Sequence, residues 1–297
     1  MIKNFDELLD KVRSLPPKRV AIPAAHAKSA IFCATLAKQE GIGNFLLIGN
    51  KKKILEQISM IEESLIDAFE IINEDDPVAC VDIAVQAVRN KEADTILKGA
   101  CTTAQLMKGV LNKETGLNAG KLISIVSVFE TKERLIIFTD GGLVLYPTLE
   151  EKVSLINNAV YVAHKMECPK PNVAVLCAIE TPNLKMPPTL DAALLSKMNQ
   201  RGEMPGCVVD GPLALDNAIS EHAAKVKGLQ SPIAGKADIL LLPSIEAGNI
   251  FAKSMTYYAN FRSGHVIIGA KVPILIASRA DDAWTKLHSV ALGVLCS

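Results

Sequence analysis

A serine–arginine pair follows the last short apolar segment of the chain. Residues 274–276 are apolar and rich in isoleucine, as buried strands are, and Ser278 and Arg279 come almost directly after them. A guanidinium holds phosphate through two parallel hydrogen bonds, and a hydroxyl can donate to an oxygen or sulfur on which charge develops. The alternative is a serine that caps a helix and an arginine whose charge is solvated. The position at the end of a buried segment favours the functional interpretation.

A second candidate loop, KGACTT, follows the apolar residues 95–97 and leads into a predicted helix. Gly99 would let the backbone approach a ligand closely. Free amides at the helix start, the Lys98 ammonium and the hydroxyls of Thr102 and Thr103 could together cradle a phosphate or an oxyanion. The loop is not a P-loop, because G-x-x-x-x-G-K-[ST] is absent. A capped helix with a surface lysine explains the same residues equally well.

Three further loops follow predicted strands, and each has an ordinary structural interpretation. Asp210, which precedes Gly-Pro, matches the start of a helix. The glycines of residues 139–142 permit an irregular loop near a ligand or a simple turn. Glu246 and Asn249 fall in the first turn of a predicted helix. Gly248, between them, lowers helix propensity, which indicates that something packs closely against that turn.

The elements that must position these residues alternate along the chain. Strands are predicted at residues 20–24, 45–48, 69–72, 95–97, 123–129, 135–138, 173–177, 206–209, 239–242, 266–268 and 274–276. Helices are predicted after Asn4 and at residues 29–40, 77–90, 103–111, 149–166, 190–200, 213–225, 246–258 and 281–295. Because several strands are apolar at successive positions, we expect a parallel sheet buried on both faces by helices, an α/β fold. Such sheets bind ligands beyond the carboxyl ends of their strands.

Composition narrows the possible partners. The 297 residues suffice for two domains, and 49% are hydrophobic. Lysine plus arginine and aspartate plus glutamate both number 32, which argues against a nucleic acid or a membrane surface attracted by bulk charge. Neither a signal-peptide pattern nor an apolar run of 18 residues is present, so we expect a cytoplasmic protein.

Metal and disulfide chemistry is not expected. Seven cysteines occur without C-x-x-C spacing, and their odd number argues against a disulfide framework or a zinc site. The five histidines lack metal spacing such as H-E-x-x-H. We therefore expect no metal, and buried free thiols in a reducing compartment.

Six blocks of the sequence together resemble the phosphate acetyl/butyryltransferase family, and its butyryl branch most closely. They are EADTILKGACTT (92–103), VLNKETGL (110–117), KMPPTLDAALLSKMNQRG (185–202), GCVVDGPLALDNA (206–218), AGKADILLLPSIEAGN (234–249) and SRADDAWTKLHSVAL (278–292). The resemblance covers nearly the whole chain, and the blocks occur in the family's order.

The resemblance implies a two-domain fold like that of isocitrate and isopropylmalate dehydrogenases. A discontinuous α/β domain, residues 1–120 plus 266–297, would carry Ser-Arg, and residues 121–265 would form the other α/β domain with the dimer contact. The implied reaction converts acyl-CoA and phosphate into acyl phosphate and free coenzyme A, with a short acyl group such as butyryl. Coenzyme A would be a substrate, no cofactor would be needed, and the active cleft would lie between the domains of a homodimer or higher homo-oligomer.

The family's motifs also imply roles for residues. Ser278 would stabilise charge on the sulfur or the carbonyl oxygen, and Arg279 would hold phosphate. A carboxylate is needed to deprotonate the thiol of coenzyme A, and Asp282 is the candidate, with Asp281 as the alternative. Substrate-binding positions implied by the matching blocks are Lys98, Gly99, Thr102, Thr103, Asp210, Glu246 and Asn249.

Three positions depart from the family's pattern. Where close relatives have Arg-Thr-Gly and then Ser-His, this chain has Asn118 and Ile125, and Trp284 stands near the position of a usual acid. These departures leave open a weak or inactive member of the family that binds coenzyme A. A third hypothesis is an NAD(P)-dependent dehydrogenase of the same fold. The lack of a Gly-rich fingerprint and of clustered acidic metal ligands counts against the dehydrogenase.

Overall fold

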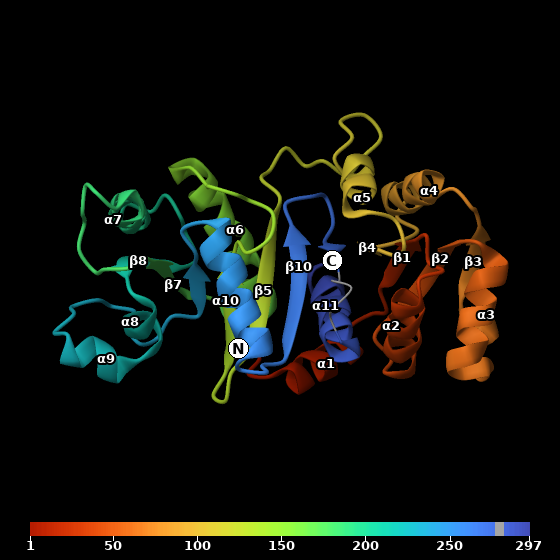
Figure 1. Cartoon of the computed structure of the whole chain (residues 1–297), viewed down its shortest axis with the longest axis horizontal. Coiled ribbons are helices and arrows are strands. Elements are labelled where there is room, and N and C mark those ends of the chain that lie inside the picture. The colour runs from red at the N-terminus through yellow and green to blue at the C-terminus, as the bar shows by residue number, and fades with distance from the viewer. Residues whose placement is uncertain (277–281) are drawn as a thin grey trace. The chain divides into compact units, whose positions relative to one another are not determined.

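The computed structural model describes the whole chain except residues 277–281. The chain folds into two compact units (Figure 1). The central unit comprises Ser124–Arg262 and the first four residues, Met1–Asn4. The terminal unit comprises Phe5–Ile123 and Ser263–Ser297. In each unit helices pack on a mainly parallel sheet, so the α/β prediction is confirmed.

The terminal unit contains a sheet with the strand order β3-β2-β1-β4-β11-β10. All pairs are parallel except β10 with β11. Its strands are β1 (Arg19–Pro23), β2 (Asn44–Gly49), β3 (Glu70–Asn73), β4 (Thr95–Leu97), β10 (Ser263–Ile268) and β11 (Ile274–Leu275). Its helices are α1 (Phe5–Arg13), α2 (Lys28–Gln39), α3 (Lys51–Glu62), the 3-10 helix η1 (Glu63–Ala68), α4 (Pro77–Arg89), α5 (Thr103–Val110) and α11 (Ala283–Cys296).

The chain reverses its direction across this sheet between β1 and β4. It runs outward from β1 through α2, β2 and α3 to β3, and then returns through α4 to β4 on the other side of β1. Right-handed crossovers therefore place α2 and α3 on one face and α4 on the other, as Figure 1 shows. Open α/β sheets bind ligands at such a switch point, outside the carboxyl ends of the strands.

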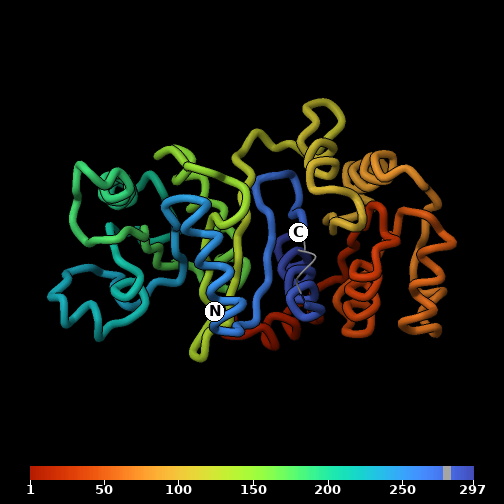
Figure 2. The backbone as a smooth tube through the Cα atoms, in the orientation of Figure 1, coloured from red at the N-terminus to blue at the C-terminus, as the bar shows by residue number. Residues whose placement is uncertain are grey.

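The C-terminal helix α11 closes the terminal unit. It packs against β10, β11 and α2. It also packs against α1, from the start of the chain (Figure 2). Phe5 of α1 stacks on His288 of α11 with their ring centroids 3.9 Å apart. Lys286 is almost as buried as the apolar residues of this helix, since only 7% of it is exposed. Helix α11, which is otherwise mostly apolar, therefore places the charged Lys286 side chain in the interior of the unit.

The strands of the central unit follow the order β5-β6-β9-β7-β8, and among these pairs only β5–β6 is antiparallel. Its strands are β5 (Ser124–Glu130), β6 (Leu135–Thr139), β7 (Asn172–Leu176), β8 (Val208–Leu213) and β9 (Ile239–Leu241). Its helices are α6 (Leu149–Lys165), α7 (Pro187–Gln200), α8 (Leu215–Ile219), α9 (Glu221–Val226) and α10 (Ile245–Tyr257). Helix α6 packs on β5, β6 and β9, whereas Phe251 and Met255 of α10 pack against a cluster that contains Phe129 and Phe138.

The region after residue 206 differs from the prediction. Asp210-Gly211-Pro212 does not begin a helix but lies inside β8, and the helix predicted at residues 213–225 is divided into α8 and α9. Strand β8 is an edge strand, and its register with β7 shifts opposite Gly-Pro. Proline is tolerated in such an edge irregularity because the ladder does not need its missing N–H.

No helix in the described part of the chain is both long and apolar enough to cross a membrane.

Candidate active site

The loop after β4 lies against the loop after β1 at the switch point of the terminal sheet. The Ala100 N–H donates to the Ala24 carbonyl over 2.8 Å. A β-carbon on Gly99 would lie 2.3 Å from the Pro23 oxygen and 2.5 Å from the Ala24 oxygen, far inside contact distance. Gly99 therefore packs closely against the protein's own β1–α2 loop, and its expected close approach to a ligand stays a prediction.

Lys98 and Thr102 are held by their own loop. The Lys98 ammonium donates to the carbonyl oxygens of Gly99 and Cys101 over 3.2 and 3.1 Å. Thr102 caps α5: its hydroxyl accepts from the Gln105 N–H over 3.1 Å, and the Gln105 side chain accepts from the Thr102 N–H over 2.8 Å. Thr102 therefore caps α5, and its expected role in substrate binding stays a prediction. Thr103, the first residue of the helix, is exposed.

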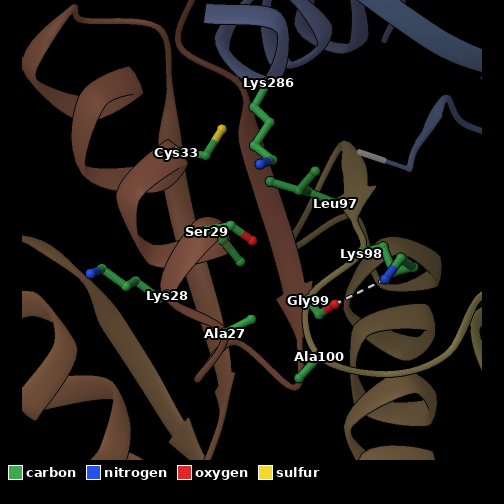
Figure 3. Close-up of a pocket in the computed structure, with 10 residues that line it drawn as sticks. Ala27, Lys28, Ser29, Cys33, Leu97, Lys98, Gly99, Ala100 and Lys286 are labelled. Carbon is green, nitrogen blue, oxygen red and sulfur yellow. Dashed lines mark hydrogen bonds between the residues drawn. The ribbon is translucent and has the colours of Figure 1, made fainter. Parts of the chain in front are cut away.

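A cavity of about 440 Å³ lies between the start of α2, the β4–α5 loop and α11. Ser29 and Lys286 point into it from opposite sides, whereas Lys28 points outward and Lys98 lies at its edge (Figure 3). The Cys33 thiol also faces this space. Burial raises the pKa of Cys33 to about 12, although the Lys286 charge partly opposes the shift, so the thiol stays protonated at neutral pH.

The predicted reactive centre can be placed only in part. Ser278 and Arg279 lie outside the described residues, between β11 and α11. Asp282 is described and is the N-cap of α11, where its carboxylate accepts from the Thr285 N–H over 2.7 Å. One turn later the same helix carries Lys286, whose ammonium enters the cavity.

In the central unit, the structure brings Glu246 and Asn249 together with the loop that follows β6. Tyr146 donates a hydrogen bond to Glu246, which lowers the pKa of that carboxyl. The Asn249 side-chain amide donates to the Gly141 oxygen over 3.3 Å. A β-carbon on Gly248 would lie 2.1 Å from the Asp140 oxygen, so the close packing expected at Gly248 is confirmed.

The same loop is organised by Asp140, a residue only 2% exposed. Its carboxylate accepts from the N–H groups of Gly142, Leu143 and Ile125 over 2.6, 2.8 and 2.9 Å. Burial raises its pKa, and these hydrogen bonds oppose the rise. The Asp140 carboxylate therefore holds the loop in a turn. A simple turn was one of the two interpretations of residues 139–142, and an irregular loop near a ligand was the other.

Asp210 lies apart from that group, within β8. It accepts a hydrogen bond from the Ser196 hydroxyl over 3.0 Å, and from the N–H of Gly211 over 2.9 Å. The structure therefore assigns it a local partner on α7.

The three departures from the family's pattern have local roles. Asn118 accepts from the Gly120 N–H over 2.7 Å, which closes a short turn. The Ile125 side chain lies beside Gly142, whose added β-carbon would be 3.6 Å from it. Trp284, in the first turn of α11, is half exposed, and its ring centroid lies 6.3 Å from that of His288.

No cluster of three or more histidine, cysteine or acidic side chains suited to a metal occurs among the described residues. The seven cysteines are free thiols, six of them buried.

Two cavity residues, Ser29 and Lys286, were not predicted from the sequence. Lys286 has a signal that could have revealed it: it is a lone cation within an apolar helical run, four residues after Asp282. Ser29 has a weaker one, because it follows the first strand at the start of a helix. Its loop contains no motif that singles it out.

The family model that matches the chain is described as "Phosphate acetyl/butaryl transferase" and covers residues 77–294. A phosphate butyryltransferase of Clostridium beijerinckii is 44% identical over an alignment of 297 positions, which covers 99% of this chain and 98% of that protein. The chain therefore has a full-length relative, and the resemblance read from the six blocks is confirmed.

Solved structures agree on the fold. A branched-chain phosphotransacylase from Enterococcus faecalis aligns with a TM-score of 0.83 and 28% identity, over 94% of this chain and 98% of that one. A putative 4-hydroxythreonine-4-phosphate dehydrogenase from Salmonella typhimurium aligns with a TM-score of 0.60 and 12% identity, over 95% of this chain and all of that one. The second likeness concerns the fold alone. Together they confirm the prediction of a dehydrogenase-like α/β fold.

Proposed function

Since this chain belongs to the phosphate acetyl/butaryl transferase family, we propose that it transfers a short acyl group between coenzyme A and inorganic phosphate. The observation that carries this proposal is the 44% identity to a phosphate butyryltransferase over 99% of the chain. The terminal unit supports it, because a lysine-bearing loop and a cavity meet at the switch point of a parallel sheet.

The reaction can be assigned to residues as follows. A phosphate oxygen attacks the thioester carbonyl carbon, the C–S bond breaks, and the electron pair leaves with sulfur, which takes up a proton to give free coenzyme A. We propose that Arg279 binds phosphate and that Ser278 donates a hydrogen bond to the carbonyl oxygen or the sulfur. In the reverse direction a base must remove the thiol proton. Asp282 remains our candidate, because a carboxylate that caps a helix can accept a further hydrogen bond.

The substrate-binding residues fall into two groups, one in each unit. Lys98, Gly99 and Thr103 stand at the carboxyl edge of the terminal sheet, and Glu246 and Asn249 stand at that of the central sheet. We propose that both groups contribute to binding. Thr102 and Asp210 would act mainly through the local structures that they hold.

The proposed activity is tested by mixing the purified protein with butyryl-CoA and phosphate and following free thiol with a chromogenic disulfide. We expect thiol release that requires both substrates. A series of acyl-CoA substrates of increasing length then defines the preferred chain, because one methylene is worth only about 1–3 kcal/mol of discrimination. Coenzyme A binding without turnover would instead indicate an inactive member of the family. Nicotinamide reduction with a hydroxy acid would indicate a dehydrogenase.

We also propose that the central unit forms the contact of a homodimer. Helix α10 exposes Ile250 and Tyr257 to 67% and 60%, and Tyr258, the residue that follows the helix, is 92% exposed. Ile250 and Tyr257 are seven residues apart and therefore share one face of the helix. Grouped large apolar side chains on a soluble domain mark interaction sites more often than isolated ones do.

Ile250→Glu combined with Tyr257→Glu should convert the dimer into a monomer, since a carboxylate buried at an interface has no partner. Sedimentation velocity measures the outcome. The unaltered protein should sediment at twice the 31.9 kDa of one chain. Met60→Glu, at an exposed position of α3, serves as the control. A dimer that survives the double substitution would place the contact elsewhere.

A further inference from the structure

The first turn of α10 is joined to the loop of residues 140–146, which follows β6. The N–H of Ile245, the first residue of the helix, donates to the Leu145 carbonyl over 2.9 Å. An N–H at this position has no partner within its own helix. Among the described contacts, the N-cap residue Ser244 makes no side-chain hydrogen bond that caps α10. The loop therefore takes over part of the capping of this helix.

The same loop holds the two side chains of α10 that belong to the candidate site. The Gly141 carbonyl accepts from the Asn249 amide over 3.3 Å, and Tyr146 donates to the Glu246 carboxylate. Glu246 and Asn249 are both exposed. Exposed polar side chains sample several rotamers, and ordering them on binding has a cost in entropy. The contacts to the loop restrict both side chains before a substrate arrives.

Asp140 in turn determines the shape of the loop. One oxygen of its carboxylate accepts from two N–H groups within the loop, and the other accepts from the Ile125 N–H of β5. Asp140 is only 2% exposed, and a β-carbon on Gly248 would lie 2.1 Å from its carbonyl oxygen. Its side chain is thus connected to β5, and its backbone lies against α10. A movement of Asp140 would displace the loop from both elements.

We propose that Asp140 is a positioning residue for the binding of coenzyme A thioesters. Its carboxylate fixes the loop, and the loop fixes Glu246 and Asn249 in the orientation that accepts the substrate. The inference rests on the proposed function, in which these two residues contribute to binding. Because Asp140 is buried, it acts through them and not by contact with the substrate.

The charge of Glu246 indicates which of the two substrates is concerned. The hydrogen bond from Tyr146 lowers the pKa of Glu246, so this exposed carboxylate is ionised at neutral pH. An ionised carboxylate repels phosphate, whereas it accepts hydrogen bonds from N–H groups. The pantetheine arm of coenzyme A carries amide groups, and the Asn249 side chain has a second N–H and an oxygen for such a group. The pair therefore suits the neutral arm of the thioester.

Asp140→Asn tests the proposal at nearly constant side-chain volume. An amide accepts through its oxygen alone, so its NH₂ group must face an N–H group of the loop or that of Ile125. We expect the KM for butyryl-CoA to rise about tenfold, the loss expected for one hydrogen bond, while kcat and the KM for phosphate stay within about twofold. Initial rates of thiol release at varied concentrations of each substrate measure these constants.

Asp238→Asn is the matched control for a buried carboxylate. Asp238 is 9% exposed, and it accepts from Arg134 over 2.9 Å and from the Asn172 N–H over 2.9 Å. It precedes β9, which runs parallel to β6, so it stands at the opposite end of these strands from Asp140. Asp238→Asn should lower the midpoint of urea denaturation and leave both KM values unchanged. A loss of stability alone would affect the two variants alike.

Two further measurements show whether Asp140 acts through α10. Titration calorimetry gives the effect of Asp140→Asn on the dissociation constant of coenzyme A, in the unaltered protein and in a variant with Glu246→Ala and Asn249→Ala. We expect weaker binding in the unaltered background only, because residues that act through one another are not additive. Tyr146→Phe, at a position that is 70% exposed, removes the bond to Glu246 without disturbing the buried carboxylate, and it should weaken binding about threefold.

The outcomes decide the proposal. A rise in the KM for butyryl-CoA in Asp140→Asn alone supports it. Equal KM values in Asp140→Asn and Asp238→Asn, or the same loss of coenzyme A affinity in both backgrounds, would overturn it. Circular dichroism verifies the fold of each variant. If Asp140→Asn does not fold, unchanged coenzyme A affinity in Tyr146→Phe overturns the proposal. An unaltered protein that binds coenzyme A but releases no thiol would contradict the proposed function, and the dissociation constants would still decide the inference.

Discussion

Gly99→Ala should both destabilise the protein and remove most of its activity. The new methyl group would overlap the carbonyl oxygens of Pro23 and Ala24, and both are backbone atoms that cannot rotate away. The β4–α5 loop must then move outward, at a cost of about 1–3 kcal/mol in the free energy of unfolding for an overpacked site. The same movement displaces Lys98 and Thr103, and a misplacement of about 1 Å can reduce the rate about 100-fold.

Gly142→Ala is the matched control for this glycine. Its added β-carbon would meet only the Ile125 side chain, at an ordinary 3.6 Å. Urea denaturation should show a lowered midpoint for Gly99→Ala alone, and the thiol-release assay should show a lowered kcat/KM. If Gly99→Ala matched the unaltered protein in both measurements, the close packing of the two loops would have no importance for the site.

Arg279→Ala should reduce kcat/KM for phosphate about 10²–10³-fold. This residue is proposed to bind phosphate. Removing one preorganised donor from a reacting centre typically lowers the rate by about this factor. Arg279→Lys should recover only part of the activity, because a lysine keeps the charge but not the planar fork that matches phosphate. The saturation kinetics of phosphate at fixed butyryl-CoA measure both variants.

Arg13→Ala is the control for the loss of an arginine. Arg13 forms surface ion pairs with Asp10 and Glu40, so its removal should change stability by only about 0–1 kcal/mol and leave the kinetics unchanged. Unchanged phosphate kinetics in Arg279→Ala would remove this residue from the reaction.

The helices and strands were largely predictable, because their signals are local. The apolar residues 95–97 form β4 with the predicted bounds, and Asp76 and Thr148 cap α4 and α6 at helix starts that the sequence marks clearly. Helix α3 was missed, although Asn50 caps it by accepting from Lys53. Only Ile54 and Ile58 of this helix are buried, so its apolar stripe is too narrow to signal a helix.

The error at β8 shows where local signals fail. Asp-Gly-Pro is typical of a helix start, but residues 210–212 pair with β7 as part of an edge strand. Whether proline begins a helix or occupies a sheet edge depends on which strand lies next to it. That neighbour, β7, is separated from them by more than thirty residues of sequence.

The sequence by itself determined the α/β class, the family and the loops after strands in which substrate residues belong, because periodicity, capping and motifs act over a few residues. Only the tertiary structure decided that β4 lies next to β1, so that the loops of Gly99 and Ala24 meet. It also decided that α11 turns Lys286 toward the start of α2, where Ser29 stands. The reason is physical: strand order and helix packing are set by the burial of surfaces far apart in the chain, and a cavity exists only where those surfaces leave space.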